Sequence, residues 1–216
     1  MIKETDLAAP VVAWLLEQHW NVYQEVEFRR WGGVADIVAE RNGIMWIIES
    51  KTSYCFAVLE QAMRWPVHYR SVAVPRSRSG RDYRVARDYY QVGVIEVDCR
   101  FEPKGVYQAI EPKLFVKHRH TVKDYLRQLT ELHKTFAVAG SSGGHHLTPY
   151  KQTMMTVRDV IERNPGCTIK FLYDTLGSMH YANKVSFHGN VLSALESIET
   201  WCKIDRSGKS VKLYIK

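Results

Sequence analysis

Three charged residues lie close together in a segment that otherwise resembles a buried β-hairpin. Asp36 precedes the pair Asn42-Gly43, and Glu49 and Lys51 follow it. Asn-Gly is the strongest short signal for a two-residue type I′ turn, because both residues accept positive φ. Such a turn places Asp36 directly opposite Glu49, with their Cβ atoms about 4.5–5.5 Å apart. The two-residue period of a strand then brings Lys51 to the same face.

This arrangement indicates a metal site that hydrolyses phosphodiesters. Two ionised carboxylates at that separation repel each other, and the apolar residues beside them predict poor access to water. We expect Asp36, Glu49 and the backbone carbonyl of Ser50 to hold Mg²⁺, with Mn²⁺ able to substitute, while Lys51 positions a water and stabilises the transition state. The alternative is a surface hairpin whose charges form an ordinary salt-bridged cluster, since E-x-K triplets are common.

A family resemblance follows from these residues. Asp36 and the triplet Glu49-Ser50-Lys51 resemble the D-(x)n-E-x-K signature of the PD-(D/E)xK nuclease superfamily, whose fold is restriction-endonuclease-like. Ala35 stands where the signature often has Pro. The resemblance covers about residues 1–100 and implies a Mg²⁺-dependent deoxyribonuclease that acts as an endonuclease.

The same resemblance implies two further site residues. Relatives often carry an acidic residue on the first helix, and Glu4 is the match that we prefer, with Glu25 on the first strand as the competitor. Several relatives also have a Gln on the helix after the E-x-K strand, followed four residues later by Tyr. Gln61 occupies that place here, although Trp65 replaces the Tyr.

The elements around the hairpin predict an α/β domain over residues 1–136. Apolar periodicity, alternation and turn signals indicate the following order. Helices are expected at about 5–19, 55–66, within 76–90 and at 121–136, and strands at 21–30, on both sides of Asn42-Gly43, and at 68–75, 92–98 and 106–116. The expected fold is a restriction-endonuclease-like mixed sheet flanked by helices.

A second, smaller domain is expected at the C-terminus. Residues 137–152 are rich in Gly, Ser and Pro and are interpreted as a linker. Residues 153–216 then predict three helices and a β-hairpin, the order of a winged helix-turn-helix domain. The first helix would be capped by Thr156, and the core stripe would include Phe171, Val185 and Ile198.

The third helix of this domain is the predicted DNA-reading element, because in helix-turn-helix proteins that helix enters the major groove. Polar side chains on its outward face, together with a lysine of the hairpin, are expected to contact DNA. They are Asn183, Lys184, Ser186, His188, Asn190 and Lys209. The alternative is a winged domain that is used for protein contacts.

The overall charge favours a polyanionic partner. The chain has 30 Lys and Arg against 23 Asp and Glu, with a pI of about 9.2. Five arginines within twelve residues are expected to bind DNA phosphates, because the guanidinium group can bond two oxygens at once. They are Arg76, Arg78, Arg81, Arg84 and Arg87. The alternative is a solvated surface on which Asp82 and Asp88 pair with these arginines.

Several other classes of protein are disfavoured. No apolar run approaches the roughly 18–20 residues that a membrane span needs, and Lys3, Glu4 and Asp6 do not fit a secretory signal, so we expect a cytoplasmic protein. The four cysteines form no C-x-x-C pair, which argues against a zinc knuckle. The pairs His145-His146 and His118 with His120 are not expected to bind metal.

The sequence thus predicts a metal-dependent endonuclease that acts on double-stranded DNA and is targeted by a winged helix. Cutting both strands from one site per chain requires a homodimer or a heteromeric nuclease partner. The first alternative is a non-catalytic DNA-binding regulator or a nuclease-like subunit of a larger DNA-processing complex. The second is an RNA-directed enzyme or RNA-binding protein on the same scaffold.

Overall fold

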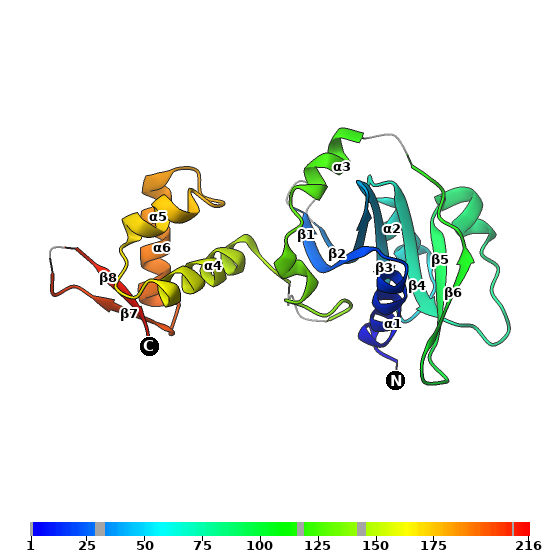
Figure 1. Cartoon of the computed structure of the whole chain (residues 1–216). Helices are drawn as coiled ribbons and strands as arrows, with labels where there is room; N and C mark the ends of the chain where they lie inside the picture. The colour runs from blue at the N-terminus through cyan, green and yellow to red at the C-terminus, as the bar shows by residue number, and fades with distance from the viewer. Residues whose placement is uncertain (1, 29–32, 116–118, 142–145, 209) are drawn as a thin grey trace. The chain divides into compact units, whose positions relative to one another are not determined.

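Six strands form one mixed sheet in the first of the two units into which the chain divides, residues 1–147 and residues 148–216. The computed structural model describes residues 2–28, 33–115, 119–141, 146–208 and 210–216, and of residues 119–121 only the backbone. Figure 1 shows both units. Each unit is described by itself.

The first unit follows the expected α/β order. Its helices are α1 (Glu4–Glu17), α2 (Phe56–Met63), the π-helical turn η1 (Val85–Tyr90), α3 (Arg119–Leu126) and the 3₁₀ turn η2 (Glu131–Lys134). Its strands are β1 (Asn21–Phe28), β2 (Gly33–Arg41), β3 (Ile44–Ser50), β4 (Tyr69–Pro75), β5 (Gly93–Asp98) and β6 (Gly105–Ile110). The strands lie in sequence order across the sheet. The pairs β3–β4 and β4–β5 are parallel, and the other three pairs are antiparallel.

The β2–β3 hairpin has the predicted turn. Arg41 pairs with Ile44, and φ is 53° at Asn42 and 78° at Gly43, so both turn residues adopt the left-handed conformation that a type I′ turn requires. The register along the hairpin is therefore the one that the Asn-Gly pair predicts, and it continues to Ile37 opposite Ile48.

Helices cover both faces of this sheet (Figure 1). On one face, the buried stripe of α1, which includes Leu7, Val11 and Leu15, packs on side chains of the central strands. On the other face, α2 packs with η1 on β4 and β5, while Tyr125 of α3 packs with Trp65. The α/β class and the mixed sheet flanked by helices are thus confirmed, and the two helix layers meet the ends of β2 and β3 from opposite sides.

The second unit contains three helices followed by a two-stranded antiparallel sheet. They are α4 (Pro149–Arg163), α5 (Ile169–Leu176), α6 (Lys184–Ser197), β7 (Cys202–Asp205) and β8 (Lys212–Ile215). Its core joins side chains from all three helices and both strands. The predicted limits of α5 are confirmed, since Thr168 caps its N-terminus and Gly177, with φ 69°, follows its last turn.

Two kinds of sequence expectation about this unit were wrong: the cap of its first helix and three of its core residues. The first helix begins at Pro149 and is capped by Thr148, not Thr156, because Pro suits the first helical position. Phe171, Val185 and Ile198, expected in the core, are exposed, and Val185 is 81% exposed. Val185 lies in the first turn of α6 and Ile198 is its C-cap residue, while Phe171 is exposed beside buried Leu172.

The expected linker, residues 137–152, is partly built into the folded units. Ala137 and Ala139 are buried in the first unit, and α4 of the second unit already begins at Pro149. Residues 142–145, which include His145, lie outside the described residues, as do His118 and Lys209. Among the helices that the structure describes, none has the length and apolar character to cross a membrane.

Candidate active site

The predicted acidic pair lies where the ladder between β2 and β3 ends, near the start of β2 and the end of β3. The last pair of the ladder, Ile37 opposite Ile48, makes Asp36 and Glu49 the next facing positions. Asp36 is 9% exposed and Glu49 is fully buried. A buried carboxylate is costly unless it is hydrogen-bonded or paired, so the neighbours of these two side chains decide what the site can do.

Both oxygens of Glu49 accept hydrogen bonds from the α2 side of the sheet. Gln61 Nε2 donates to Glu49 Oε2 at 2.6 Å, and Trp65 Nε1 donates to Glu49 Oε1 at 2.6 Å. Trp65 is itself fixed by edge-to-face contacts with Phe28 and Tyr125. The structure therefore brings Gln61 to the predicted site and adds Trp65, whose indole N–H the sequence did not predict as a partner of Glu49.

Asp36 is held by the backbone of the neighbouring strand. The N–H of Ser50 donates to Asp36 Oδ2 at 2.7 Å. Ser50 is fully buried, and its Oγ is buried without a hydrogen-bond partner among the described residues. The sequence interpretation gave Ser50 a role through its carbonyl, whereas the contact seen here uses its amide.

Lys51 and Glu4 form an ion pair at the edge of the site. Lys51 Nζ lies 3.0 Å from Glu4 Oε1 and 2.9 Å from Glu4 Oε2. Glu4 is the first residue of α1, so the start of that helix is brought to the end of β3. Both side chains are about one-third exposed, which makes this pair the part of the site closest to solvent.

Glu25, the competing acidic residue, also belongs to the site. The pairs Gln24 with Ile37 and Val26 with Ala35 flank it, so Glu25 stands opposite Asp36. It is 6% exposed and has a φ of 49°, an unusual value for a non-glycine residue inside a strand. The N–H of Gly140 donates to Glu25 Oε1 at 2.7 Å.

Asp36, Glu49, Glu25 and Glu4, together with Lys51, form an acidic cluster that has more carboxyl groups than cations. Burial, together with the charge of Asp36, raises the pKa of Glu49 well above its usual value. Burial also raises the pKa of Asp36, although the Ser50 N–H opposes the shift, and burial raises the pKa of Glu25 to about 7. Burial alone would lower the pKa of Lys51, but its hydrogen bonds with Glu4 and the charges of Asp36 and Glu49 raise it.

The donor set fits a hard divalent cation in its chemistry. Four carboxylates gather around the single ammonium of Lys51, and oxygen ligands are those that Mg²⁺ and Mn²⁺ prefer. Among the described residues, however, no group of three or more Asp, Glu, His or Cys side chains is arranged to hold a metal ion. The reason is that Glu49 directs its oxygens to Gln61 and Trp65, while Glu4 directs its oxygens to Lys51.

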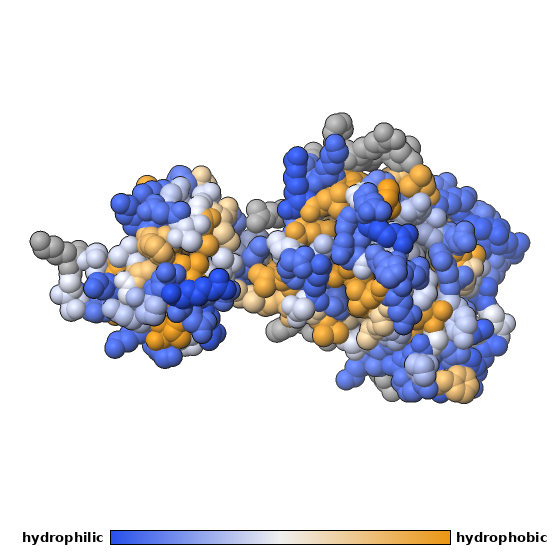
Figure 2. Space-filling view, in the orientation of Figure 1, coloured by the Kyte–Doolittle hydropathy of each residue, from blue (hydrophilic) through white to orange (hydrophobic). Residues whose placement is uncertain are grey.

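The arginine-rich segment is exposed and partly paired within itself. Arg84 pairs with Asp82, and Arg87 with Asp88, as the alternative interpretation expected. Arg76 stacks on the ring of Tyr107, with its Cζ 4.0 Å from the centroid. Arg81 donates to a backbone carbonyl at 2.9 Å, and Arg78 is exposed. Figure 2 shows a hydrophilic surface on the side of the first unit where this segment lies in Figure 1.

The residues that are predicted to read DNA from α6 differ in their contacts and their burial. Asn183 caps the helix, since its Oδ1 accepts a bond from the Ser186 N–H at 2.9 Å. His188 packs against the rings of Tyr173 and Phe187, and its Nε2 is buried. Asn183 is exposed, whereas His188 is half-buried and does not face fully outward as expected.

The remaining predicted residues of α6 lie at or near the surface. Lys184 is exposed, with its Nζ 5.3 Å from the centroid of the Tyr173 ring. Asn190 is exposed and donates to the carbonyl of Ser186 at 2.7 Å, while Ser186 is half-buried. Lys184 and Asn190 are thus the predicted contacts within α6 that are exposed, and Ser186 is partly accessible.

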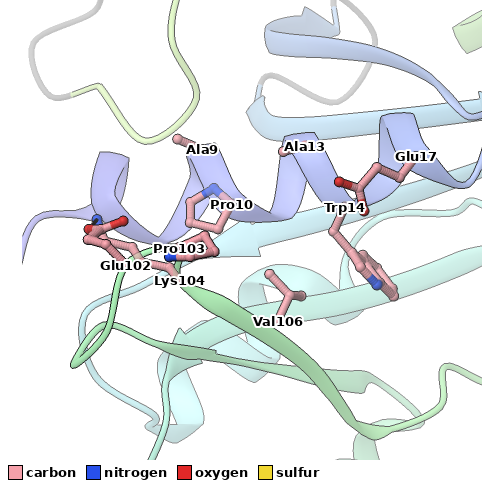
Figure 3. Close-up of a pocket in the computed structure, with 9 residues that line it drawn as sticks. All are labelled: Ala9, Pro10, Ala13, Trp14, Glu17, Glu102, Pro103, Lys104 and Val106. Atoms are coloured by element: carbon pink, nitrogen blue, oxygen red, sulfur yellow. Dashed lines mark ion pairs between the residues drawn. The ribbon is translucent and has the colours of Figure 1, made fainter.

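A hollow of about 380 Å³ in the first unit is separate from the acidic cluster. It lies between α1 and the segment that enters β6 (Figure 3). Its lining residues are Ala9, Pro10, Ala13, Trp14, Glu17, Glu102, Pro103, Lys104 and Val106. No member of the acidic cluster lines this hollow.

The chain was compared with protein families, curated proteins and solved structures, and none of the three comparisons identified a relative. The chain matches no protein-family model, no curated protein and no solved structure.

Proposed function

We propose that this protein is a divalent-metal-dependent DNA endonuclease of the PD-(D/E)xK class, with a restriction-endonuclease-like first unit. The observation that carries the proposal is the cluster at the end of the β2–β3 ladder, where the charges of buried Asp36, Glu49 and Glu25 interact with that of Lys51. A structural salt bridge needs one acid for each base. An excess of buried carboxylates with raised pKa values is instead typical of a functional site.

In the proposed site, Asp36 and Glu49 hold the cation, with the Ser50 carbonyl as a further ligand. Bound Mg²⁺ lowers the pKa of a water and neutralises charge on the scissile phosphate. Binding would require Glu49 to share or exchange its bonds with Gln61 and Trp65, which are 2.6 Å each. These two donors keep the carboxylate in place until then and limit its rotation.

Lys51 is the proposed group that stabilises the transition state. Its ammonium is held by Glu4 at the more open edge of the cluster, where a phosphate could reach it. Negative charge that develops on the phosphoryl oxygens would compete with Glu4 for that ammonium. Glu4 is therefore proposed as the residue that orients Lys51, and Glu25, which faces Asp36, as the additional acidic residue beside the metal.

The second unit is proposed to be a winged helix-turn-helix domain that binds duplex DNA through α6. Three helices followed by an antiparallel hairpin support this assignment, as does a balance of ten Lys and Arg against six Asp and Glu over residues 151–216. Lys184, Ser186 and Asn190 are the proposed contacts. Arg76, Arg78, Arg81, Arg84 and Arg87 are the proposed phosphate contacts of the first unit. Cutting both strands would require a second copy or a partner nuclease.

The experiment is cleavage of supercoiled plasmid with Mg²⁺, with Mn²⁺ and with EDTA. We expect nicked or linear product with either metal and none with EDTA. Glu49→Ala and Lys51→Ala should remove the activity, whereas Glu40→Ala should keep it, because Glu40 lies on the same hairpin but bonds to Asn21 and Gly43 near the turn. Full activity in purified Glu49→Ala and Lys51→Ala would refute the proposal.

One observation favours a second candidate, a non-catalytic DNA-binding subunit. The oxygens of Glu49 and Glu4 are already engaged by partners, and the described residues contain no ready three-ligand metal group. A protein of this kind would bind DNA with the same affinity in EDTA and in Mg²⁺, and Glu49→Ala would not change that affinity. Fluorescence anisotropy with a labelled duplex distinguishes the two candidates.

A further inference from the structure

The chain that leads from the first unit toward the second makes close contacts with the acidic cluster. Ala139 is fully buried, and its N–H donates to Gln24 Oε1 at 3.0 Å. The next N–H, that of Gly140, donates to Glu25 Oε1 at 2.7 Å. Gln24 Nε2 also donates to the carbonyl of Lys134 at 3.2 Å, so two consecutive residues of β1 bind this segment.

Gly140 also lies against the start of α1. Its φ is 76°, in the left-handed region that favours glycine. A Cβ at this position would lie 2.7 Å from the carbonyl carbon of Glu4 and 2.9 Å from the backbone N of Thr5. Both are backbone atoms, so neither can move aside without shifting the first turn of the helix.

Glu25 needs such support because of its own backbone. A φ of 49° interrupts the regular alternation of β1, and a non-glycine residue adopts this conformation in a strand only where its surroundings impose it. The side chain is almost fully buried and faces the like charge of Asp36. An N–H donor at 2.7 Å offsets part of that repulsion.

We propose that Ala139-Gly140 is a positioning element of the active site, which fixes the Glu25 carboxylate beside Asp36 through the Gly140 N–H. Because Gly140 packs on the backbone of Glu4, the same residue also sets where the Glu4–Lys51 ion pair stands. Gly140 itself touches no reacting atom. This inference rests on the proposed metal-dependent function and names the backbone that keeps two of its carboxylates in place.

The test compares two alanine substitutions in the full-length chain. Gly140→Ala introduces a Cβ that collides with Glu4, whereas Gly43→Ala introduces one at a similar φ of 78° with no described atom within 4 Å. The backbone strain of the two variants is therefore matched. We expect Gly140→Ala to weaken Mn²⁺ binding about tenfold in calorimetry and to lower kcat about tenfold, with KM for DNA unchanged. Gly43→Ala should keep all three values.

Equal Mn²⁺ affinity and kcat in the two variants would overturn the inference. A mutant cycle adds an independent criterion. If Gly140 acts through Glu25 and Glu4, then Gly140→Ala in a background that carries both Glu4→Gln and Glu25→Gln should cause less than a twofold further loss of Mn²⁺ affinity. A full tenfold further loss would mean that Gly140 acts through neither carboxylate, which also overturns the inference.

A milder variant covers the case in which Gly140→Ala does not fold. Gln24→Ala removes the two bonds that Gln24 makes to the segment but introduces no collision, and Asn21→Ala on the same strand is its control. We expect a threefold to fivefold loss of Mn²⁺ affinity in Gln24→Ala alone. No difference between these two variants would contradict the inference.

The outcomes also separate this inference from the proposed function. Wild-type protein that binds Mn²⁺ but leaves DNA intact would refute the nuclease function, and the Mn²⁺ affinities of the variants would still decide the role of Gly140. Wild-type protein that binds no Mn²⁺ would refute both.

Discussion

The acidic cluster of the first unit and helix α6 of the second unit both carry several polar side chains, but they hold them differently. In the cluster, Asp36 and Glu49 are buried, and each bonds to a donor that is itself fixed by the fold. In α6, Lys184 and Asn190 are exposed, and their partners lie on the same helix or the neighbouring one.

This difference shows that a polar residue says more about function when it is buried than when it is exposed. Burying a carboxylate lowers folding stability by several kcal/mol unless the surroundings compensate for it. A chain that keeps several buried carboxylates at one end of a sheet therefore does so at the expense of stability. An exposed lysine or asparagine costs almost nothing. The geometry of the cluster therefore supports the proposed function directly, whereas for α6 the support comes only from its charge and its place in the fold.

The largest expected effect is that of Lys51→Ala on cleavage. Removing the ammonium deprives the proposed transition state of its charge partner, and we expect the cleavage rate to fall about 100-fold or more. The measurement is single-turnover cleavage of a labelled duplex in Mg²⁺. The matched control is Lys123→Ala, an exposed lysine of α3, which should keep the wild-type rate. Equal cleavage rates in the two variants would mean that Lys51 contributes no more to cleavage than an exposed lysine does.

The second expected effect is a pH dependence of stability in metal-free protein. The folded-state pKa values of Asp36, Glu49 and Glu25 are raised, that of Glu25 to about 7. Groups of this kind contribute stability that is fully present below their unfolded pKa and is lost as the pH rises through the folded value. The free energy of unfolding should therefore decrease from pH 5 to pH 8 by about 1–3 kcal/mol.

Urea unfolding in EDTA at several pH values measures this loss. Mg²⁺ should offset it at pH 8, because a bound cation removes the repulsion. Glu49→Gln should reduce the slope, since an amide does not titrate. The same slope in wild type and Glu49→Gln would show that the cluster does not control the pH dependence.

The third expected effect is that of Trp65→Phe. The substitution keeps an aromatic ring but removes the indole N–H that binds Glu49. We expect about tenfold slower cleavage and a stability loss of about 1–3 kcal/mol, because a buried acceptor loses a donor. Trp46→Phe is the control, since Trp46 Nε1 makes a buried bond of 3.0 Å to the Ser71 hydroxyl on the α1 face. That variant should lose stability but keep its cleavage rate, and slow cleavage by both would indicate a general packing effect.

The smallest expected effect is that of Lys184→Ala on DNA binding. Loss of one phosphate contact should weaken the affinity a few-fold and reduce the salt slope of log K by about one. Thermal stability should not change, because Lys184 is exposed. The measurement is anisotropy at several salt concentrations, with Glu49→Ala as the comparison. An unchanged salt slope in Lys184→Ala would remove α6 from the proposed interface.

Local rules predicted the hairpin that carries the site. Asn42 and Gly43 fix the turn by their conformational preference, the turn fixes the register, and the register makes Asp36 and Glu49 facing positions. The capping residues of α5 were predictable for the same reason, since Thr168 and Gly177 act on the residues beside them.

Tertiary partners were not predictable in the same way. Trp65 follows the C-cap residue of α2, and the packing of that helix on the sheet sets its distance to Glu49. Gly140 binds Glu25 across 115 residues of sequence, within a Gly- and Ser-rich stretch that has the composition of a linker. His188 is half-buried because its ring packs against Tyr173 of α5 and Phe187 of α6, and the Tyr173 contact cannot be seen from periodicity within one helix.

The two N–H groups of Ala139-Gly140 also set a limit on how the two units can be recombined. The change in composition suggests a junction near residue 137, yet a chimera joined there would leave the donors to Gln24 and Glu25 behind with the second unit. A junction at Thr148, where the second unit begins, keeps them with the sheet. Domain exchange, whether in evolution or in the laboratory, would therefore have to carry Ala139 and Gly140 along with the first unit.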